Sequence, residues 1–212
     1  MNLEKWDKSS IINYHKQPER SYAGDVLSPE IIRLSKKYIG NSILDVGAGS
    51  GALISLIPNA IGVDLVSKHP RIIRGDISTI SFKDQCFDTV FATEVLEHLN
   101  DETLEKCLDE IHRILQTDGC LIITVPNNED LKKNMVMCPR CGSKFHRVGH
   151  MQIFDVNRMR DMLEKKRFEI VRIECLSIGF MAKHKSLKHF KYFLELIGYI
   201  ESNSLFAVAI KR

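Results

Sequence analysis

A glycine-rich segment that begins with a carboxylate is the part of the sequence best suited to hold a small ligand. Gly47, Ala48 and Gly49 follow the apolar segment Ser42–Val46, and Asp45 lies two residues before the first glycine. Glycines permit a tight turn and let a ligand approach the backbone closely. A pyrophosphate bound at the start of the following helix would be repelled by Asp45. The segment therefore favours a ligand that carries positive charge, and the alternative is that Asp45 only caps the turn.

Two further carboxylates follow the next apolar segments and indicate an adenosine group. Asp64 ends the segment Ala60–Asp64, with Leu65 after it, and can accept hydrogen bonds from both ribose hydroxyls. Asp76 can accept from the adenine amino group while Ile77 packs on the ring, or it is simply a turn residue. An adenosine with an ammonium and a sulfonium but no phosphate is S-adenosylmethionine. Asp64 alone would suit NAD equally well.

The run from Glu94 to His98 brings two carboxylates and an imidazole together. If this run is helical, Glu94, Glu97 and His98 share one face, at the carboxyl ends of the strands, where open α/β sheets bind ligands. Three interpretations stay open. His98 acts as a general base, because its pKa lies nearest neutrality; the three side chains hold a divalent metal ion; or they only shape the cofactor pocket.

A cysteine–histidine segment has the spacing of a structural zinc site. Cys138, Cys141, His146 and His150 follow the pattern Cys-x2-Cys-x4-His-x3-His. Two thiolates in a tight turn and two imidazoles can complete a tetrahedral zinc shell with no position for water. Such a zinc ion would stabilise a polar segment too small to form a core of its own.

Alternating strands and helices must position these side chains. From residue 42 to 125, short apolar segments alternate with helical ones, which indicates a doubly wound α/β sheet covered on both faces. A helix is expected to start with Ser28 as its N-cap and Pro29 in its first position. The other expected elements are a helix over 101–115, a helix capped by Asp155, strands over 168–177 and 205–210, and a helix over 187–200.

The length of 212 residues suits one domain, 1–212. Within it we expect a lid segment over 1–27 and an inserted metal-binding loop over 127–150.

Six short segments occur in order: Ile43–Gly51, Gly62–Asp64, Gly75–Asp76, Phe87–Val90, Glu94–Leu99 and Leu121–Asn127. Together they resemble the type 11 group of class I S-adenosylmethionine-dependent methyltransferases, over residues 28–175. The resemblance implies a Rossmann-like sheet of about seven strands, mostly parallel, with an antiparallel last strand. It also implies a role for each cofactor-site residue: Asp45, Gly47 and Gly49 at the methionine portion, Asp64 at the ribose, Asp76 and Ile77 at the adenine, and Thr93 beside the sulfonium.

The run from Glu94 to His98 also resembles the metal-binding segment of some O-methyltransferases, including small-RNA 2′-O-methyltransferases and those of ubiquinone synthesis. In such enzymes a histidine after the fifth strand completes the set. The resemblance therefore offers an alternative in which His150 belongs to the active site. Cys138, Cys141 and His146 would then need a fourth zinc ligand from elsewhere.

The overall composition bounds the remaining expectations. The net charge is only +3, too little to indicate a nucleic-acid partner by itself. The polar N-terminal residues lead us to expect no signal peptide, and no apolar run reaches 18 residues. A cytoplasmic methyltransferase acting on a small molecule, with O-methylation favoured, is the expectation. The alternatives are a nucleic-acid methyltransferase that uses the basic stretch 183–191, a non-catalytic binding module and, less favoured, an NAD-dependent oxidoreductase. Tyr14, Tyr22, His98 and Phe180 are candidates to line the acceptor site.

Overall fold

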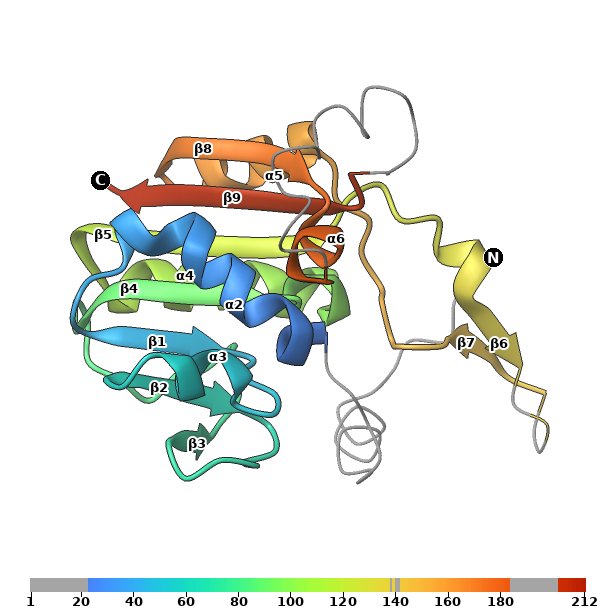
Figure 1. Ribbon diagram of the computed structural model, residues 1–212, viewed down its shortest axis with the longest axis horizontal. Helices are drawn as coiled ribbons and strands as arrows, with labels where there is room; N and C mark the ends of the chain where they lie inside the picture. Colours follow the sequence, from blue (N-terminus) through green and yellow to red (C-terminus); the bar gives the residue numbers. More distant parts are fainter. Residues whose placement is uncertain (1–22, 138, 140–141, 184–201) are drawn as a thin grey trace.

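Short apolar segments of the sequence come together as one seven-stranded sheet (Figure 1). The computed structural model describes residues 23–137, 139, 142–183 and 202–212. The strands lie in the order β3-β2-β1-β4-β5-β9-β8. Their bounds are β1 Ile43–Val46, β2 Ala60–Asp64, β3 Ile72–Arg74, β4 Phe87–Thr93, β5 Leu115–Pro126, β8 Phe168–Leu176 and β9 Ser204–Lys211.

Parallel pairing places the ends of the first five strands at one edge of the sheet. β1 pairs in parallel with β2 and β4, β2 with β3, and β4 with β5. β9 runs antiparallel to both of its neighbours, β5 and β8. The predicted doubly wound sheet with an antiparallel last strand is therefore confirmed. The carboxylates that end β1 and β2 and the run that follows β4 are brought to the same edge.

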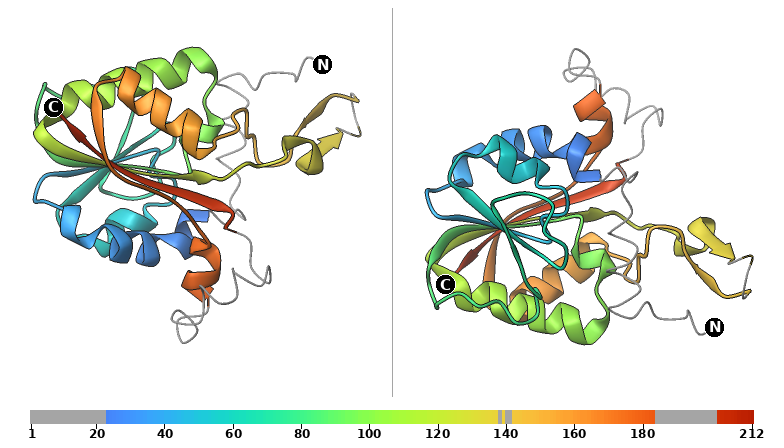
Figure 2. Two further views of the ribbon diagram at one scale, coloured as in Figure 1. Left: turned by 90° about the horizontal axis from the view of Figure 1, so that it is seen from above. Right: turned by 90° about the horizontal axis from the view of Figure 1, so that it is seen from below.

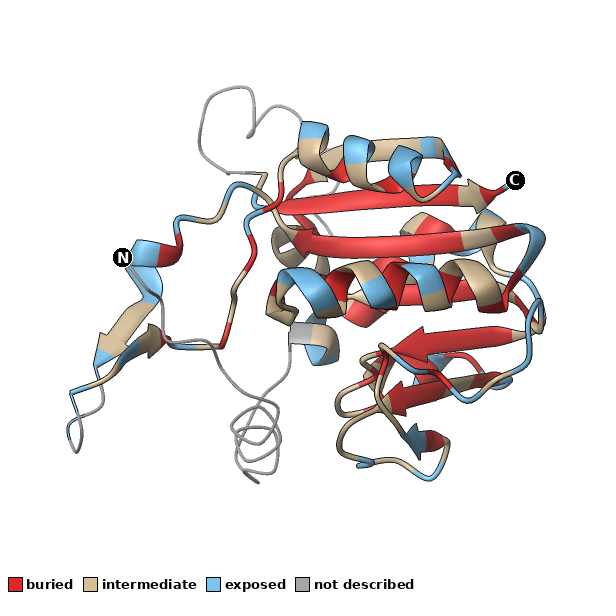
Figure 3. Ribbon diagram, turned by 180° about the vertical axis from the view of Figure 1, so that it is seen from behind, coloured by how far each residue is buried: buried red, intermediate tan, exposed pale blue. Residues whose placement is uncertain are grey.

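Helices cover both faces of the sheet, which explains why its strands are almost continuously apolar (Figure 2). One face carries α4 (Asp101–Ile114) and α5 (Val156–Lys165), and the other carries α2 (Ala23–Ser35), α3 (Ala52–Leu56) and α6 (Ile178–Lys183). The strands form the buried centre, and the outward faces of the helices are exposed (Figure 3). Within the described residues, no helix is long and apolar enough to cross a membrane.

The helix expected to start at Ser28 begins five residues earlier, at Ala23. Ser28 is buried, and its hydroxyl donates to the Gly24 carbonyl at 2.5 Å instead of capping a helix start. Pro29 consequently lies inside α2. The expectation was wrong because a serine–proline pair is typical of a helix start, whereas here burial of Ser28 gives its hydroxyl a partner one turn back. Most of the expected lid (residues 1–22) and the expected helix over 187–200 lie outside the described residues.

The segment between β5 and α5 leaves the sheet and returns to it. It contains the short helix η3 (Leu131–Asn134) and an antiparallel hairpin of β6 (Met135–Met137) and β7 (Lys144–His146). In Figures 1 and 2 this hairpin projects beyond the edge at which the parallel strands end. The chain then runs back beside the start of the insertion, where Asn127 forms a bridge with Phe154.

Candidate active site at the carboxyl edge of the sheet

The glycine turn after β1 adopts a backbone conformation that requires glycine at its first position. Gly47 has a φ of +74°, and its N–H donates to the Val63 carbonyl at 2.8 Å. A Cβ atom on Gly47 would lie 2.3 Å from Cγ2 of Val95, in the segment that follows β4. The missing side chain therefore lets the glycine turn pack directly against the run from Glu94 to His98. Ala48, the middle residue of the turn, is buried and also donates to the Val63 carbonyl, at 3.2 Å.

The two strand-end carboxylates lie in different surroundings. Asp45 is only 2% exposed and its Oδ1 has no hydrogen-bond partner, so burial raises its pKa well above the usual value, with a further contribution from the charge of Asp64. Asp64 accepts from the backbone N–H of Gly49 and of Val66, both at 2.9 Å. Asp64 thus fixes the glycine turn, and a cationic ligand would offset the cost of the buried Asp45 charge.

The residues expected around the adenine and the sulfonium lie beyond the neighbouring strands. Asp76 Oδ1 accepts from the N–H and the hydroxyl of Ser78, so the turn that was the alternative for Asp76 is present. Ile77 is buried in the core, and Leu65 after β2 is half-buried. Thr93 is the last residue of β4 and pairs with Thr124 of β5. The ligand contacts expected of these residues remain predictions.

The run after β4 does not form the helix in which its side chains would share a face. Glu94 has a φ of +52°, which is not a helical conformation. The helical part of the run is a single 3-10 turn, η2 (Leu96–His98). A non-glycine residue with positive φ is a strained conformation that recurs at functional sites. Glu97 is 1% exposed, and neither of its carboxylate oxygens has a hydrogen-bond partner. Burial, followed by the charge of Glu94, raises the pKa of Glu97 well above its usual value.

The chain that returns from the insertion brings His150 to this run. The Met151 and Gln152 N–H groups both donate to the Glu97 carbonyl, at 2.7 and 3.1 Å. His150 Nε2 lies 3.9 Å from Glu97 Oε1, and the His150 and His98 rings meet edge to face at 4.7 Å. One ligating atom each from Glu97, His98 and His150 lies within 4.8 Å of the others, a spacing that a metal ion could bridge. This geometry favours the alternative in which His150 belongs to the active site.

Glu129, which the sequence did not single out, joins a second group with His146 and His150. Ligating atoms of these three side chains also lie within 4.8 Å of one another. Burial is the largest single influence and by itself would raise the pKa of Glu129. The hydrogen bonds with His150 and Asn134 and the charges of His150 and His146 together outweigh it, so the pKa is lowered. Burial lowers the pKa of His146, with a smaller contribution from His150. Cys138 and Cys141 lie outside the described residues, so the four-ligand zinc site stays a prediction.

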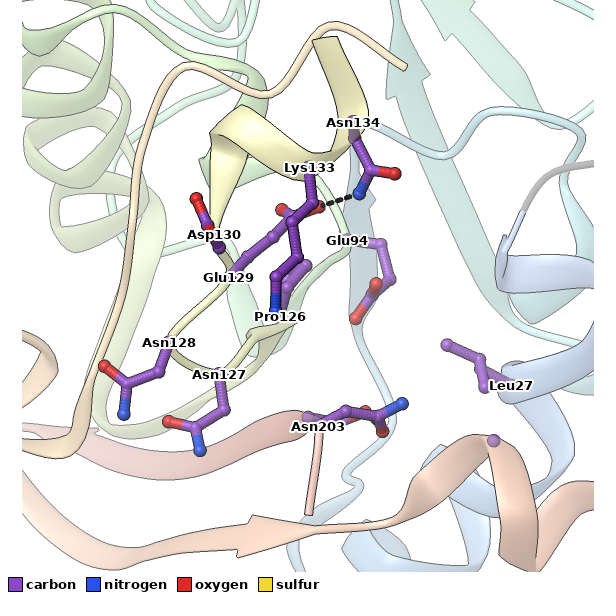
Figure 4. A pocket seen from close by; sticks show the side chains of 12 residues that line it. Leu27, Glu94, Pro126, Asn127, Asn128, Glu129, Asp130, Lys133, Asn134 and Asn203 are labelled. Atoms are coloured by element: carbon purple, nitrogen blue, oxygen red, sulfur yellow. Dashed lines mark hydrogen bonds between the residues drawn. The ribbon is translucent and has the colours of Figure 1, made fainter. Parts of the chain in front are cut away.

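A cavity of about 440 Å³ opens beside these groups (Figure 4). Glu94 and Glu129 approach it from two walls, and Lys133 extends across a third from η3. Of the residues expected to line an acceptor site, Phe180 lies in α6 next to the lining residue Gly179, whereas Tyr14 and Tyr22 lie outside the described part. The residues that line the cavity are Leu27, Glu94, Pro126, Asn127, Asn128, Glu129, Asp130, Lys133, Asn134, Gly179, Asn203 and Ser204.

Comparison with known proteins identifies the family to which the chain belongs. Residues 19–173 match the family described as a methyltransferase domain, and the chain therefore belongs to that family. The particular relatives are of several kinds. The chain is 34% identical over 145 residues to an uncharacterized protein of Methanocaldococcus jannaschii, covering 63% of each chain. It is 30% identical over 118 residues to the mitochondrial ubiquinone biosynthesis O-methyltransferase of Rattus norvegicus, covering 45% of this chain and 34% of the rat protein.

A similar fold occurs in the 1,6-didemethyltoxoflavin-N1-methyltransferase of Burkholderia thailandensis, solved with S-adenosylhomocysteine bound. The TM-score is 0.63 at 16% identity, over 88% of this chain and 78% of that one. The matches to the archaeal and rat proteins span less than two thirds of those proteins' own length. The rat protein is named as an O-methyltransferase, and the Burkholderia protein, whose similarity is one of fold, is named as an N1-methyltransferase.

Proposed function

We propose that this chain transfers the methyl group of S-adenosylmethionine to a hydroxyl of a small polar acceptor, with a divalent cation held by Glu94, Glu97, His98 and His150. The observation that carries the proposal is the meeting of Glu97, His98 and His150 beside the end of β4, within 4.8 Å. The cofactor would lie along the ends of β1, β2 and β4, on Asp45, Gly47, Ala48, Gly49, Asp64, Leu65, Asp76, Ile77 and Thr93.

Buried carboxylates without partners support the cation. Glu97 has two such oxygens and Glu94 has one. An ionised carboxylate that is buried without a compensating partner is costly. Two carboxylates and imidazoles are donors that suit divalent ions such as Mg²⁺ or Mn²⁺. The donor set therefore fits a divalent cation, which would replace the missing partners of Glu94 and Glu97.

The proposed reaction requires the protein to align the acceptor hydroxyl with the methyl group and to allow the hydroxyl proton to leave. The acceptor oxygen forms a bond to the methyl carbon while the bond from that carbon to sulfur breaks, and the sulfonium becomes a neutral thioether. When bound, a divalent cation would lower the pKa of a hydroxyl that ligates it. The hydroxyl proton leaves to solvent through the cavity that Glu94 lines. Holding the hydroxyl in line with the methyl group contributes much of the rate.

The lining of the cavity favours a polar acceptor. Its volume of about 440 Å³ suits a small molecule. Four asparagine side chains surround it, and the Oδ1 atom of one of them, Asn127, is buried without a hydrogen-bond partner. An amide oxygen accepts hydrogen bonds from hydroxyl groups. We therefore expect an acceptor with several hydroxyl groups.

Two binding experiments on the full chain test the proposal. Calorimetric titration with S-adenosylhomocysteine should show binding, and electron paramagnetic resonance should show Mn²⁺ binding. Glu97→Gln should weaken Mn²⁺ binding by at least about tenfold, because a ligand is lost, and should leave binding of S-adenosylhomocysteine unchanged. Glu102→Gln is the matched control, because Glu102 is an exposed carboxylate on the surface of α4 that forms a salt bridge with Lys106. Wild-type protein that binds neither compound would refute the proposed reaction.

A further inference from the structure

Two side chains that contact His150, those of His146 and Glu129, have no role in the proposed reaction. His146 is 4% exposed and its ring stacks on that of His150 at 4.8 Å and 23°. Glu129 reaches both rings. One of its oxygens is hydrogen-bonded to His150 Nδ1, and the other lies 3.5 Å from His146 Nε2. The three side chains form a continuous row that ends at His150.

The backbone determines which nitrogen of His146 carries the proton. The His150 N–H donates to His146 Nδ1 at 3.0 Å. A neutral imidazole has one N–H and one acceptor nitrogen, so the proton of His146 must lie on Nε2. A metal ligand has to offer a nitrogen lone pair. In this conformation the lone pair of Nδ1 is engaged by the backbone. Nε2 carries the proton, lies 3.5 Å from Glu129 Oε1 and has no hydrogen-bond partner among the described residues.

The same reasoning fixes His150 in the opposite tautomer. A carboxylate only accepts hydrogen bonds, so Glu129 requires the His150 proton on Nδ1. The remaining nitrogen, Nε2, then faces Glu97 Oε1 with its lone pair available. A carboxylate that accepts from the far nitrogen of a ligating histidine fixes its tautomer and orientation.

We infer that Glu129 and His146 are positioning residues that hold His150 as an Nε2 ligand beside Glu97 and His98, and that His146 is not a ligand of the predicted zinc ion. This inference rests on the proposed cation site. The inference implies that the insertion after β5 supplies and orients a ligand of the proposed cation, because Glu129 lies at its start, and His146 and His150 lie near its end.

The insertion is built to keep Glu129 in place. The Asn134 side chain donates to Glu129 Oε1 at 3.1 Å, and the Arg147 N–H donates to the Asn134 carbonyl at 2.8 Å. The turn after β7 and the helix η3 before the hairpin are therefore linked through Asn134, which also contacts Glu129. A change at Arg147, directly after the hairpin, would reach His150 through three hydrogen bonds: Arg147 to Asn134, Asn134 to Glu129, and Glu129 with His150.

Nitrogen-15 NMR of the imidazole rings tests the tautomers directly in the full chain. Wild-type protein should show His146 protonated on Nε2 and His150 protonated on Nδ1. Glu129→Gln should disturb the His150 pattern, because the amide can donate as well as accept. Cys138→Ser should leave the His146 pattern unchanged. A His146 ring protonated on Nδ1, or one whose signals shift in Cys138→Ser, would overturn the inference.

Mn²⁺ affinity supplies the second measurement. Glu129→Gln should weaken Mn²⁺ binding by about 10- to 100-fold, the range found when such orienting partners are removed, with binding of S-adenosylhomocysteine unchanged as the test of folding. Asp130→Asn is the matched control, because it removes a carboxylate from the same loop whose contact is with the Lys132 backbone. If Glu129→Gln binds Mn²⁺ as tightly as wild type, the positioning role is refuted. If wild-type protein does not bind Mn²⁺ at all, the proposed cation site is refuted. The NMR measurement of the His146 and His150 tautomers then still tests the contacts among Glu129, His146 and His150.

Discussion

Replacing Gly47 by alanine tests whether the glycine turn and the run after β4 are packed as one unit. Two separate costs are expected. The φ of +74° is unfavourable for a residue with a side chain by about 1–2 kcal/mol. The new Cβ would also lie 2.3 Å from Val95 Cγ2 and 2.8 Å from Val95 Cβ. Such overpacking in a buried place costs about 1–3 kcal/mol.

A second glycine in the chain separates these two costs. Gly142 has the same φ of +74°, but a Cβ there would have no atom within 4 Å. Gly142→Ala therefore carries only the backbone cost. Gly47→Ala should be less stable than Gly142→Ala by about 1–3 kcal/mol, the cost of overpacking. In a chain of this length that difference lowers the melting temperature by a further 2–12 °C, roughly.

Urea unfolding at equilibrium measures both variants against wild type, and calorimetric titration with S-adenosylhomocysteine measures the functional consequence. Gly47 is one of the residues proposed to hold the cofactor, so Gly47→Ala should weaken binding of the cofactor product, and Gly142→Ala should not. Adding Val95→Ala to Gly47→Ala should restore part of the stability, because it removes the contact at 2.3 Å and leaves the one at 2.8 Å. Equal stabilities for the two alanine variants would refute the packing argument.

Three further substitutions test the elements around the site. The folded-state pKa of Asp45 is raised above its unfolded value of about 4, so the protein takes up a proton on folding and loses stability as pH rises above about 4. Asp45→Asn should therefore be more stable than wild type at pH 7, and this gain should shrink toward pH 4. The same substitution should weaken cofactor binding. Asn100→Ala removes the cap bond to the Thr103 N–H at 2.9 Å and should cost about 1 kcal/mol in urea unfolding, whereas Asn100→Ser should not. Arg71→Ala removes bonds to four backbone carbonyls, from α3 through the following turn to the start of β2, and should cost about 2–3 kcal/mol. Arg74→Ala, at an exposed position, should cost less than about 0.5 kcal/mol.

The strands were predictable because each is a short apolar segment bounded by turn residues. The second strand was expected at Ala60–Asp64 and is found there, and the helix over 101–115 ends one residue earlier than expected. The fifth strand is longer than its apolar part. Residues 115–119 are mostly polar, yet the strand begins at Leu115, which pairs with Phe87 of β4. Pairing with a neighbour extended this element beyond what its composition indicated.

The site was predictable only where a residue follows directly from a strand end. Asp45 and Asp64 end parallel strands, so the fold by itself brings them to one edge. Glu129 could not be found in this way, because its role depends on His150, 21 residues away in the sequence. That contact is produced by the hydrogen bonds of the returning chain to the Glu97 carbonyl. No local pattern of residue types encodes such a pairing.

The order of the strands explains how one insertion can alter the acceptor side of the site without disturbing the cofactor side. β4 and β5 are neighbours, and the Glu94 N–H donates to the Thr124 carbonyl at 2.8 Å, so the insertion after β5 emerges beside the run after β4. The carboxylates proposed to hold the cofactor instead lie at the ends of β1 and β2, on the other side of β4. Substitutions in the hairpin should therefore change cation affinity and acceptor choice, with binding of S-adenosylmethionine preserved. A hairpin variant that loses both affinities together would show that the two halves of the site are not separable.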